Sequence, residues 1–361
     1  MNAETFVIVN HSAARARAAW IEVRRALLGA GVSFDAHEAR EFGDARSSAR
    51  DALAAGYRTL AVVGGDGTLG EVVNGFFTIE NEAERNVIKS DVDRTSGPEA
   101  SNSVVVRAIN HAAALAVLPA GTGNDFARAL EGHRASLAHG IARLIAHCRA
   151  EVDAHSKLSV DAELVEEINR TEETTRRVDV LRGSVDGGTR SFFCLNAVTL
   201  GIGAEVAARV AAQGRLARGL SGEGRFALAA LPALARWRER RVRVRVDDGD
   251  ARELRTNLIA VVNSRFAGGG MMFSPTARID DGLLDVVTAS RLSRAMLARE
   301  MTRIHAGGHV ANPRVSIVRA SRVIIEHVTK ADALTVEADG DVRGMTPLEL
   351  CVVPRALRVV I

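Results

Sequence analysis

Two glycine-rich segments, each set between a predicted strand and a predicted helix, most constrain how this chain can fold. The first is Gly64-Gly65-Asp66-Gly67-Thr68, which follows the apolar run 60–63. The second is Gly121-Thr122-Gly123-Asn124-Asp125, which follows the apolar run 114–118. A strand that enters a tight turn and leaves it as a helix is the repeating unit of a parallel α/β sheet. Because parallel strands end at one edge of their sheet, the two turns are expected to converge on one crevice.

The first part of the chain repeats this strand–helix alternation. Alternating apolar runs and helical periodicities indicate strands at 6–9, 32–36, 60–63 and 114–118, and helices at 13–28, 45–55, 69–77 and from 126 onward. We therefore predict that residues 1–150 form one α/β domain with a parallel sheet. The polar stretch 80–110 breaks the pattern and contains Thr95-Ser96-Gly97-Pro98, which predicts a surface or disordered insertion.

After about residue 150 the pattern changes to short β-like runs separated by Gly, Asp and Asn. These runs lie at 157–160, 191–195, 242–246, 258–262, 284–288, 322–325, 334–337 and 348–353, and helical patterns at 204–212, 224–240 and 294–304. A chain of 361 residues is long enough for two domains. We predict that residues 151–361 form a second domain, an antiparallel sandwich or barrel.

The two glycine turns have the chemistry of an anion site. Glycines let backbone N–H groups approach an anion closely, and the helix that follows each turn directs its positive N-terminus to the same place. Asp66 could orient a metal-bound water or a nucleotide hydroxyl, and Thr68 could cap the helix or bind a phosphate oxygen. Neither turn matches G-x-G-x-x-G or the P-loop, and a turn without any ligand is the alternative for each. Their convergence favours a phosphate-rich ligand.

Four segments, in this order, resemble the signatures of the diacylglycerol kinase catalytic-domain family, in its bacterial lipid kinase branch. They are Val63–Thr68 with Glu71 and Asn74-Gly75, then Leu118–Arg128, then Val262–Asp285, and last Glu337-Ala338-Asp339-Gly340-Asp341. The first signature is shared with NAD kinases and sphingosine kinases. The resemblance implies that residues 1–150 are a nucleotide-binding α/β domain similar to that of NAD kinase and phosphofructokinase. It also implies that residues 151–361 are a β-sandwich domain that binds the lipid substrate, with a C-terminal end that can pack back on the first domain. ATP would lie in the cleft between the two domains.

The resemblance also implies an activity, ATP-dependent transfer of the γ-phosphoryl group to a lipid hydroxyl. Diacylglycerol, which would give phosphatidic acid, is the first expectation. The alternatives are another lipid (ceramide, a sphingoid base or phosphatidylglycerol), NAD as the acceptor, and a catalytically silent lipid or nucleotide sensor. The basic segment and the later signatures speak against NAD kinase, and the intact Asp66, Asn124 and Asp339 speak against a silent sensor.

The resemblance assigns roles to individual residues. ATP would contact Asn10, Gly64, Gly65, Asp66, Gly67, Thr68, Glu71, Gly121, Thr122, Gly123 and Asn124. Asp339 would be the catalytic base, although Asp339-Gly340 alone is also a common hairpin turn. A structural Mg²⁺ would bind Asp281 and the backbone carbonyls of Arg278 and Leu283, and a second Mg²⁺ would accompany ATP. For Asp281 the alternative is an ordinary turn.

The chain departs from the family pattern in a few places. The family usually has N-P-x-[SA]-G where this chain has Asn10-His11-Ser12-Ala13-Ala14, so the proline and the glycine after Asn10 are absent. Ala39 stands where the family often has a nucleotide-contacting Thr, and Asp341 replaces the Glu of D-G-E. None of these changes removes a predicted phosphate ligand or the base.

Charge and cysteine content bear on the partners. The net charge is only +3 and aromatic residues are 4%, so neither supports a nucleic-acid partner. Residues 209–245, however, contain ten arginines, no lysine and two acidic residues. A basic helix there would bind an anionic membrane surface, and the alternative is a solvated arginine face on a helix packed in the core. Three scattered cysteines, with no signal peptide and no long apolar run, predict a cytoplasmic protein that can contact the inner membrane face. The sequence makes no prediction of the oligomeric state.

Overall fold

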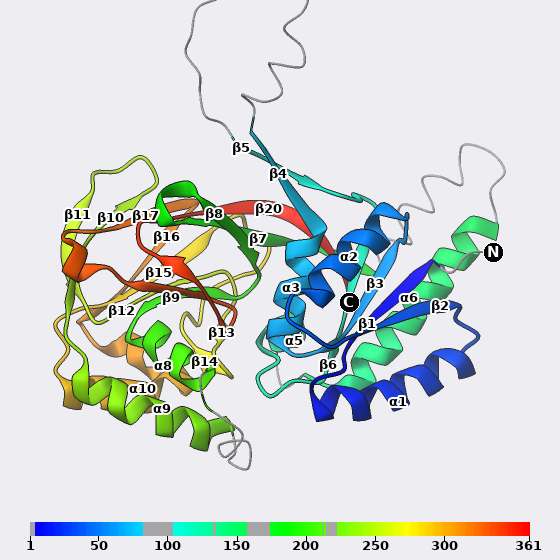
Figure 1. Cartoon of the computed structure of the whole chain (residues 1–361), viewed down its shortest axis with the longest axis horizontal. Coiled ribbons are helices and arrows are strands. Elements are labelled where there is room, and N and C mark those ends of the chain that lie inside the picture. The colour runs from blue at the N-terminus through cyan, green and yellow to red at the C-terminus, as the bar shows by residue number, and fades with distance from the viewer. Residues whose placement is uncertain (1–3, 82–103, 133–134, 157–173, 212, 214–221) are drawn as a thin grey trace, which may run out of the picture.

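The computed structural model describes residues 4–81, 104–132, 135–156, 174–211, 213 and 222–361. It has two lobes placed side by side (Figure 1). The elements of the first lobe are β1 (Thr5–Asn10), α1 (Ala14–Gly29), β2 (Phe34–Ala39), α2 (Asp44–Ala54), β3 (Thr59–Gly64), α3 (Asp66–Phe76), β4 (Phe77–Asn81), β5 (Val104–Ala108), β6 (Ala114–Pro119), α5 (Asp125–Glu131) and α6 (Leu137–Ser156).

Strands β6, β3, β1 and β2 lie in this order in a parallel sheet, with their carboxyl ends at one edge. Apolar residues of α1 and α6 pack on one face of the sheet. Those of α2, α3 and α5 pack on the other face. The result is the three-layer α/β arrangement that the alternation of strands and helices predicts.

The second lobe is a sandwich of two sheets. Its elements are β7 (Thr175–Val185), β8 (Arg190–Cys194), β9 (Ala197–Gly201), α8 (Ile202–Ala211), α9 (Gly222–Arg236), β10 (Arg240–Val246), β11 (Arg252–Thr256), β12 (Leu258–Val262), β13 (Phe266–Ala267), β14 (Met271–Met272), β15 (Leu284–Ala289), α10 (Arg294–Arg303), β16 (Val315–Ala320), β17 (Arg322–His327), β18 (Thr335–Ala338), β19 (Asp341–Met345) and β20 (Leu348–Val360). One sheet has the order β16-β15-β12-β9-β18-β19. Its apolar face packs against β7, β8, β10, β17 and β20.

Strand β20 joins the two lobes. Its first residues pair with β17, Arg358 and Val359 pair in parallel with β6, and its other edge pairs with β7. One sheet therefore runs through both lobes, as the red strand in Figure 1 shows. The α/β and β-sandwich fold classes are confirmed, and the boundary at residue 150 stays a prediction.

Several element boundaries differ from the sequence predictions. The second strand begins at Phe34 rather than at 32, because the chain leaves α1 through Gly31 with a φ of +73°. The ends of the predicted insertion pair as an antiparallel ribbon of β4 and β5, and residues 82–103 lie outside the described part. The strand predicted at 157–160 also lies outside it.

The basic segment is not one helix. Helix α9 ends at Arg236, and Arg240–Val246 form strand β10, whereas the sequence predicted a helix to residue 240. The alternation of arginine and valine in this strand places the valines Val242 and Val244 in the core and leaves Arg243 and Arg245 exposed. No helix among the described residues is long and apolar enough to cross a membrane.

Candidate active site

The two glycine turns lie in direct contact at the carboxyl ends of β3 and β6. A Cβ on Gly121 would lie 2.4 Å from the Cα of Gly65, and one on Gly65 would lie 2.9 Å from the Cα of Gly121. The N–H of Ala120 donates to the carbonyl of Gly64 over 2.8 Å. Glycine is needed at these two positions because two backbones approach each other there, and the turns converge as the sequence predicts.

The first residue of the helix that follows each turn is an aspartate. Asp66 begins α3, and its Oδ1 accepts the N–H of Phe126 over 3.2 Å. Asp125 begins α5, and its Oδ2 accepts the N–H of Gly269 over 2.7 Å. Asp125 is buried, and its Oδ1 has no hydrogen-bond partner among the described residues. Burial, and then the nearby charge of Asp66, raise the pKa of Asp125 to about 7, and burial also raises the pKa of Asp66.

Asp125 is a residue that the sequence reasoning missed. The predicted ATP ligands of the second turn end at Asn124, although Asp125 begins α5 as Asp66 begins α3. Its signal was this equivalence between two strand–turn–helix junctions. An acidic residue that is buried, close to another carboxylate and left with a free oxygen is a typical ligand for a cation.

The remaining residues of the turns hold each other in place. Asn10, at the end of β1, donates to the Oγ1 of Thr68 over 2.8 Å. Asn124 has a φ of +53° and closes the second turn, because its Oδ1 accepts the N–H of Gly121 and its Nδ2 donates to the carbonyl of that glycine. The Oγ1 of Thr122 accepts from Arg15 over 3.4 Å.

Glu71 points away from this junction. Its Oε2 accepts the N–H of Gly43 over 3.0 Å, so it holds the loop before α2. Burial raises its pKa. Asn74, one turn further along α3, donates from Nδ2 to the carbonyl of Phe193 and accepts the N–H of Phe193 at Oδ1. This pair of hydrogen bonds ties α3 of the first lobe to β8 of the second.

The contact between α3 and β8 brings Asp339 to the first lobe. Asp339 follows β18 with a φ of +48°, and a Cβ on Gly70 of α3 would lie 3.8 Å from the Cβ of Asp339. The Asp339 carboxylate accepts the N–H groups of Leu195, Asn196 and Ala197 over 2.8–3.2 Å. Burial of the carboxyl group raises its pKa to about 6, although these hydrogen bonds lower the pKa. The residue as a whole is partly exposed, whereas its carboxyl group is buried.

A second buried carboxylate supports the turn at Asp339. Glu337 accepts the hydroxyl of Thr199 on β9 and the N–H of Gly340. Burial raises the pKa of Glu337 to about 7. Glu337 begins the fourth signature, and its role was not predicted from the sequence. Its contacts fix the Asp339-Gly340 turn to the neighbouring strand.

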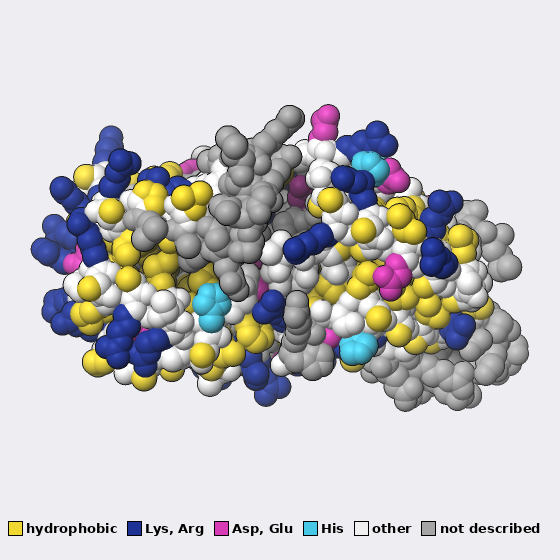
Figure 2. Space-filling model, turned by 90° about the horizontal axis from the view of Figure 1, so that it is seen from below, with side chains coloured by type: hydrophobic (Ala, Val, Ile, Leu, Met, Phe, Trp, Pro, Cys, Tyr) yellow, Lys and Arg dark blue, Asp and Glu magenta, His cyan; other side chains and the backbone are white. Residues whose placement is uncertain are grey.

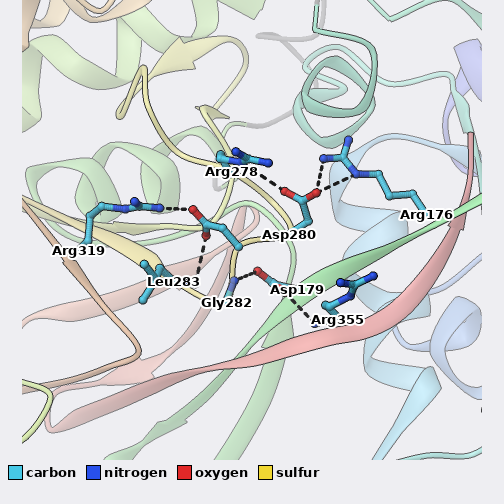
Figure 3. A network of polar contacts seen from close by, with 9 residues as sticks. Arg176, Asp179, Arg278, Asp280, Gly282, Leu283, Arg319 and Arg355 are labelled. Carbon is cyan, nitrogen blue, oxygen red and sulfur yellow. Dashed lines mark hydrogen bonds and ion pairs between the residues drawn. The ribbon is translucent and has the colours of Figure 1, made fainter.

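The predicted structural Mg²⁺ residues lie in the loop that leads to β15 (Figure 3). The Asp281 carboxylate accepts the N–H of Leu283 over 3.1 Å and forms an ion pair with Arg319. Arg278 pairs with Asp280 over 3.6 Å. Among the residues that the structure describes, no group of three or more His, Cys, Asp or Glu side chains is arranged around a metal position. A guanidinium occupies the place of a cation at Asp281, and the Mg²⁺ site there stays a prediction.

Comparison with known proteins connects this geometry to a family. Residues 4–156 match the family described as the diacylglycerol kinase catalytic domain, and residues 196–361 match the YegS C-terminal NAD kinase beta sandwich-like domain. A diacylglycerol kinase of Mycobacterium tuberculosis is 30% identical over 245 residues, which are 68% of each chain. The "Probable lipid kinase YegS-like" of Pseudomonas aeruginosa is 30% identical over 319 residues, which are 88% of this chain and 82% of that one.

Solved structures agree at the level of the fold. A diacylglycerol kinase from Bacillus anthracis str. Sterne superimposes with a TM-score of 0.59 at 18% identity, covering 99% of this chain and 96% of that chain. The two family matches and the relatives cover both lobes, including the glycine turns and the strand that carries Asp339. This chain therefore belongs to the diacylglycerol kinase and YegS-like family of lipid kinases.

Proposed function

We propose that this protein transfers the γ-phosphoryl group of ATP to a lipid hydroxyl, and that the lipid is diacylglycerol, giving phosphatidic acid. The observation that carries the proposal is the position of Asp339. The Cβ of this second-lobe aspartate lies against α3, the helix that begins in the first glycine turn. A phosphate site and a candidate base from different lobes thus face one another.

The triphosphate would lie along the two turns. The N-termini of α3 and α5 start there, and a Cβ on Gly67 would meet no atom within 4 Å, so the turn is open on that side. Backbone N–H groups and helix N-termini bind phosphate oxygens without any basic side chain. Asn10, Gly64, Gly65, Gly67, Thr68, Gly121, Thr122, Gly123 and Asn124 would form the cradle, while Glu71 would act through the loop that it holds.

The carboxylates of Asp66 and Asp125 fit a Mg²⁺ ion that accompanies ATP. Mg²⁺ prefers carboxylate oxygens and is usually held by one or two of them together with substrate phosphates. The partnerless, buried Oδ1 of Asp125 is the observation that favours this assignment. When bound, the ion would neutralise charge on the phosphates. A cation would also offset the mutual repulsion of Asp66 and Asp125.

Asp339 would accept the proton of the attacking hydroxyl. The lipid oxygen forms a bond to the γ-phosphorus, the bond from phosphorus to the β,γ-bridging oxygen breaks, and ADP leaves. The proton moves to a carboxylate oxygen of Asp339. A base with a pKa near 6 is mostly ionised at neutral pH and is close enough to the working pH to be efficient.

Substrate assays with γ-labelled ATP test the proposal. The purified chain would be incubated with Mg²⁺ and, in separate reactions, diacylglycerol, ceramide, a sphingoid base, phosphatidylglycerol or NAD. We expect label in the organic phase with diacylglycerol. Label in another lipid would keep the lipid kinase and reject diacylglycerol. Label in NADP alone would establish the nucleotide alternative, and ATP binding without any transfer would indicate a sensor.

We also propose that the lipid is reached at an anionic membrane surface. Figure 2 shows Lys and Arg side chains gathered at the end of the molecule formed by the second lobe. In the basic segment of this lobe, Arg238, Arg243 and Arg245 are exposed and have no ion-pair partner among the described residues, whereas Arg241 is paired with Glu253. Each such arginine near an anionic surface contributes about 1 kcal/mol at most.

Changing Arg238, Arg243 and Arg245 together to Glu is therefore expected to abolish sedimentation with vesicles rich in phosphatidylglycerol. Binding of the unchanged protein should weaken as salt increases, because the attraction is screened. The control is the triple change of Arg24, Arg25 and Arg50 to Glu, which alters exposed arginines of α1 and α2 by the same charge. Equal sedimentation of both variants would reject this surface as the membrane contact.

A further inference from the structure

Arg343 occupies an irregular position in the strand that follows Asp339. In the pairing of β18 with β19, Val336 lies opposite Gly344 and Glu337 lies opposite Val342. Arg343 is therefore an extra residue with no opposite partner, a β-bulge. Bulges redirect a side chain and occur often beside active sites.

The Arg343 side chain is largely buried, but few of its N–H donors have a hydrogen-bond partner. The Arg343 side chain is only 16% exposed, and its guanidinium lies 5.8 Å from the centre of the Phe192 ring. Among the described residues, its ion pair is a 3.3 Å contact from Nη2 to the carboxylate of Asp341. The buried Nε has no hydrogen-bond partner among the residues that the structure describes. A guanidinium has five N–H donors in a planar fork, so most of its capacity is unused.

Arg343 also lies close to the proposed base and to the phosphate turn. The Nη2 of Arg343 would be 3.9 Å, and the Cβ of Asp339 3.8 Å, from a Cβ on Gly70. Both groups therefore border the same point on α3. Gly70 is four residues after Asp66, a rise of about 6 Å along a helix axis. Because Gly70 has no side chain, it places no side-chain atom between α3 and these two residues.

We propose that the Arg343 guanidinium binds the phosphoryl group while it moves from ATP to the acceptor, and then the phosphate of the product. The inference rests on the proposed function, since it needs a phosphoryl group beside Asp339. Charge spreads over the equatorial oxygens of the transferred group, and a planar pair of N–H donors matches two of them. The attacking hydroxyl gives its proton to Asp339, and Arg343 exchanges no proton, because its guanidinium stays protonated.

A purely structural arginine would behave differently. If Arg343 served only to neutralise Asp341, an ion pair of better geometry would be expected, such as the one at Arg241, whose Nε and Nη2 both contact Glu253. The single longer contact, the bulge and the partnerless Nε together favour a missing anionic ligand. Only the position beside Asp339 identifies that ligand as a phosphoryl group.

The test compares Arg343→Gln and Arg343→Lys with the unchanged protein. We expect Arg343→Gln to lower kcat about 10³-fold or more, the low end of what transition-state arginines contribute. The KM for ATP should change less than about threefold. Arg343→Lys should recover part of the loss, because it restores the charge but not the fork. Added guanidinium ion should raise the rate of Arg343→Ala, whereas equal potassium chloride should not.

A second measurement is independent of the lipid. Aluminium fluoride added with ADP and Mg²⁺ mimics the transferred phosphoryl group, so the unchanged protein should bind ADP more tightly in its presence. Arg343→Gln should lose this gain and keep its affinity for ADP alone. If the unchanged protein phosphorylates no lipid but shows this difference, the proposed function fails and the assignment of Arg343 stands.

The control variant is Arg190→Gln on β8, which removes an exposed arginine with a similar 3.4 Å ion pair to Asp186. It should leave kcat and the aluminium fluoride effect unchanged. An Arg343→Gln variant with kcat within threefold of the unchanged protein would overturn the inference. So would a loss of activity that tracks a lower melting temperature and that neither lysine nor guanidinium ion restores.

Discussion

Replacing Asp339 by Asn is expected to lower kcat by about 10²- to 10⁴-fold while the affinity for ATP stays nearly constant. General bases contribute rate factors of this size. The asparagine has nearly the same shape, and its one oxygen can still accept from the N–H groups of Asn196 and Ala197, while its NH2 group replaces the oxygen that accepts from Leu195. It cannot accept the proton of the hydroxyl. Label transfer from ATP gives kcat, and calorimetric titration with a non-hydrolysable ATP analogue gives the affinity.

The pH profile gives the same assignment a second test. The folded protein raises the pKa of Asp339 to about 6, so the carboxylate is protonated, and unable to act as a base, below that pH. The value of kcat/KM, which reports the ionisation of the free enzyme, should therefore rise with pH through about 6 and level off above 7. A profile that is flat from pH 5 to 8 would contradict the role of Asp339.

Asp186 offers a matched control for the substitution. It has a φ of +54°, close to the +48° of Asp339, and its Oδ1 also accepts a backbone N–H, that of Met345. It lies in the β7–β8 turn, away from the phosphate turns. Asp186→Asn should keep full activity, so any cost of an asparagine in left-handed backbone is measured separately. Asp339→Asn activity within tenfold of the unchanged protein would reject the base assignment.

The features that could be predicted from the sequence are local ones. A strand, a glycine turn and a helix leave a pattern within about twenty residues. Both turns and the three-layer α/β arrangement of the first lobe could therefore be predicted. The pairing of β20 with β6 and β7 joins residues far apart in the chain, and no local pattern encodes it. Helix α9 ends at Arg236, before the predicted end at residue 240. The reason is local, because the alternation of arginine and valine from residue 240 onward has the two-residue period of a strand.

The candidate site shows the same division. Asp66 and Asp339 lie within signatures and could be named from the sequence. Asp125 could have been named, because it matches Asp66 in its own turn. The bridge from Asn74 to Phe193 and the bulge at Arg343 could not, because both depend on how the lobes and strands meet in space. Neither a hydrogen bond between lobes nor an unpaired strand residue has a sequence pattern.

Replacing Gly121 by Ala is expected to separate the two turns, destabilise the first lobe and greatly weaken ATP binding. The added Cβ would lie 2.4 Å from the Cα of Gly65 and 2.9 Å from Oδ1 of Asn124. The first contact is with backbone, which has no rotamer to change, so the strands that carry the turns must move. Overpacking of this kind costs about 1–3 kcal/mol or more. Thermal unfolding and ATP-analogue titration measure the two effects.

Gly67→Ala is the matched control, because it adds the same methyl group to the same pair of turns. Its Cβ would meet no atom within 4 Å, and Gly67 lies within α3. Alanine is favoured over glycine in a helix by up to about 1 kcal/mol, so the melting temperature should stay equal or rise. A Gly121→Ala protein that melts as high as Gly67→Ala would show that the turns are not in backbone contact. ATP affinity would then have to come from a looser arrangement, in which the two helix N-termini do not converge on one phosphate group.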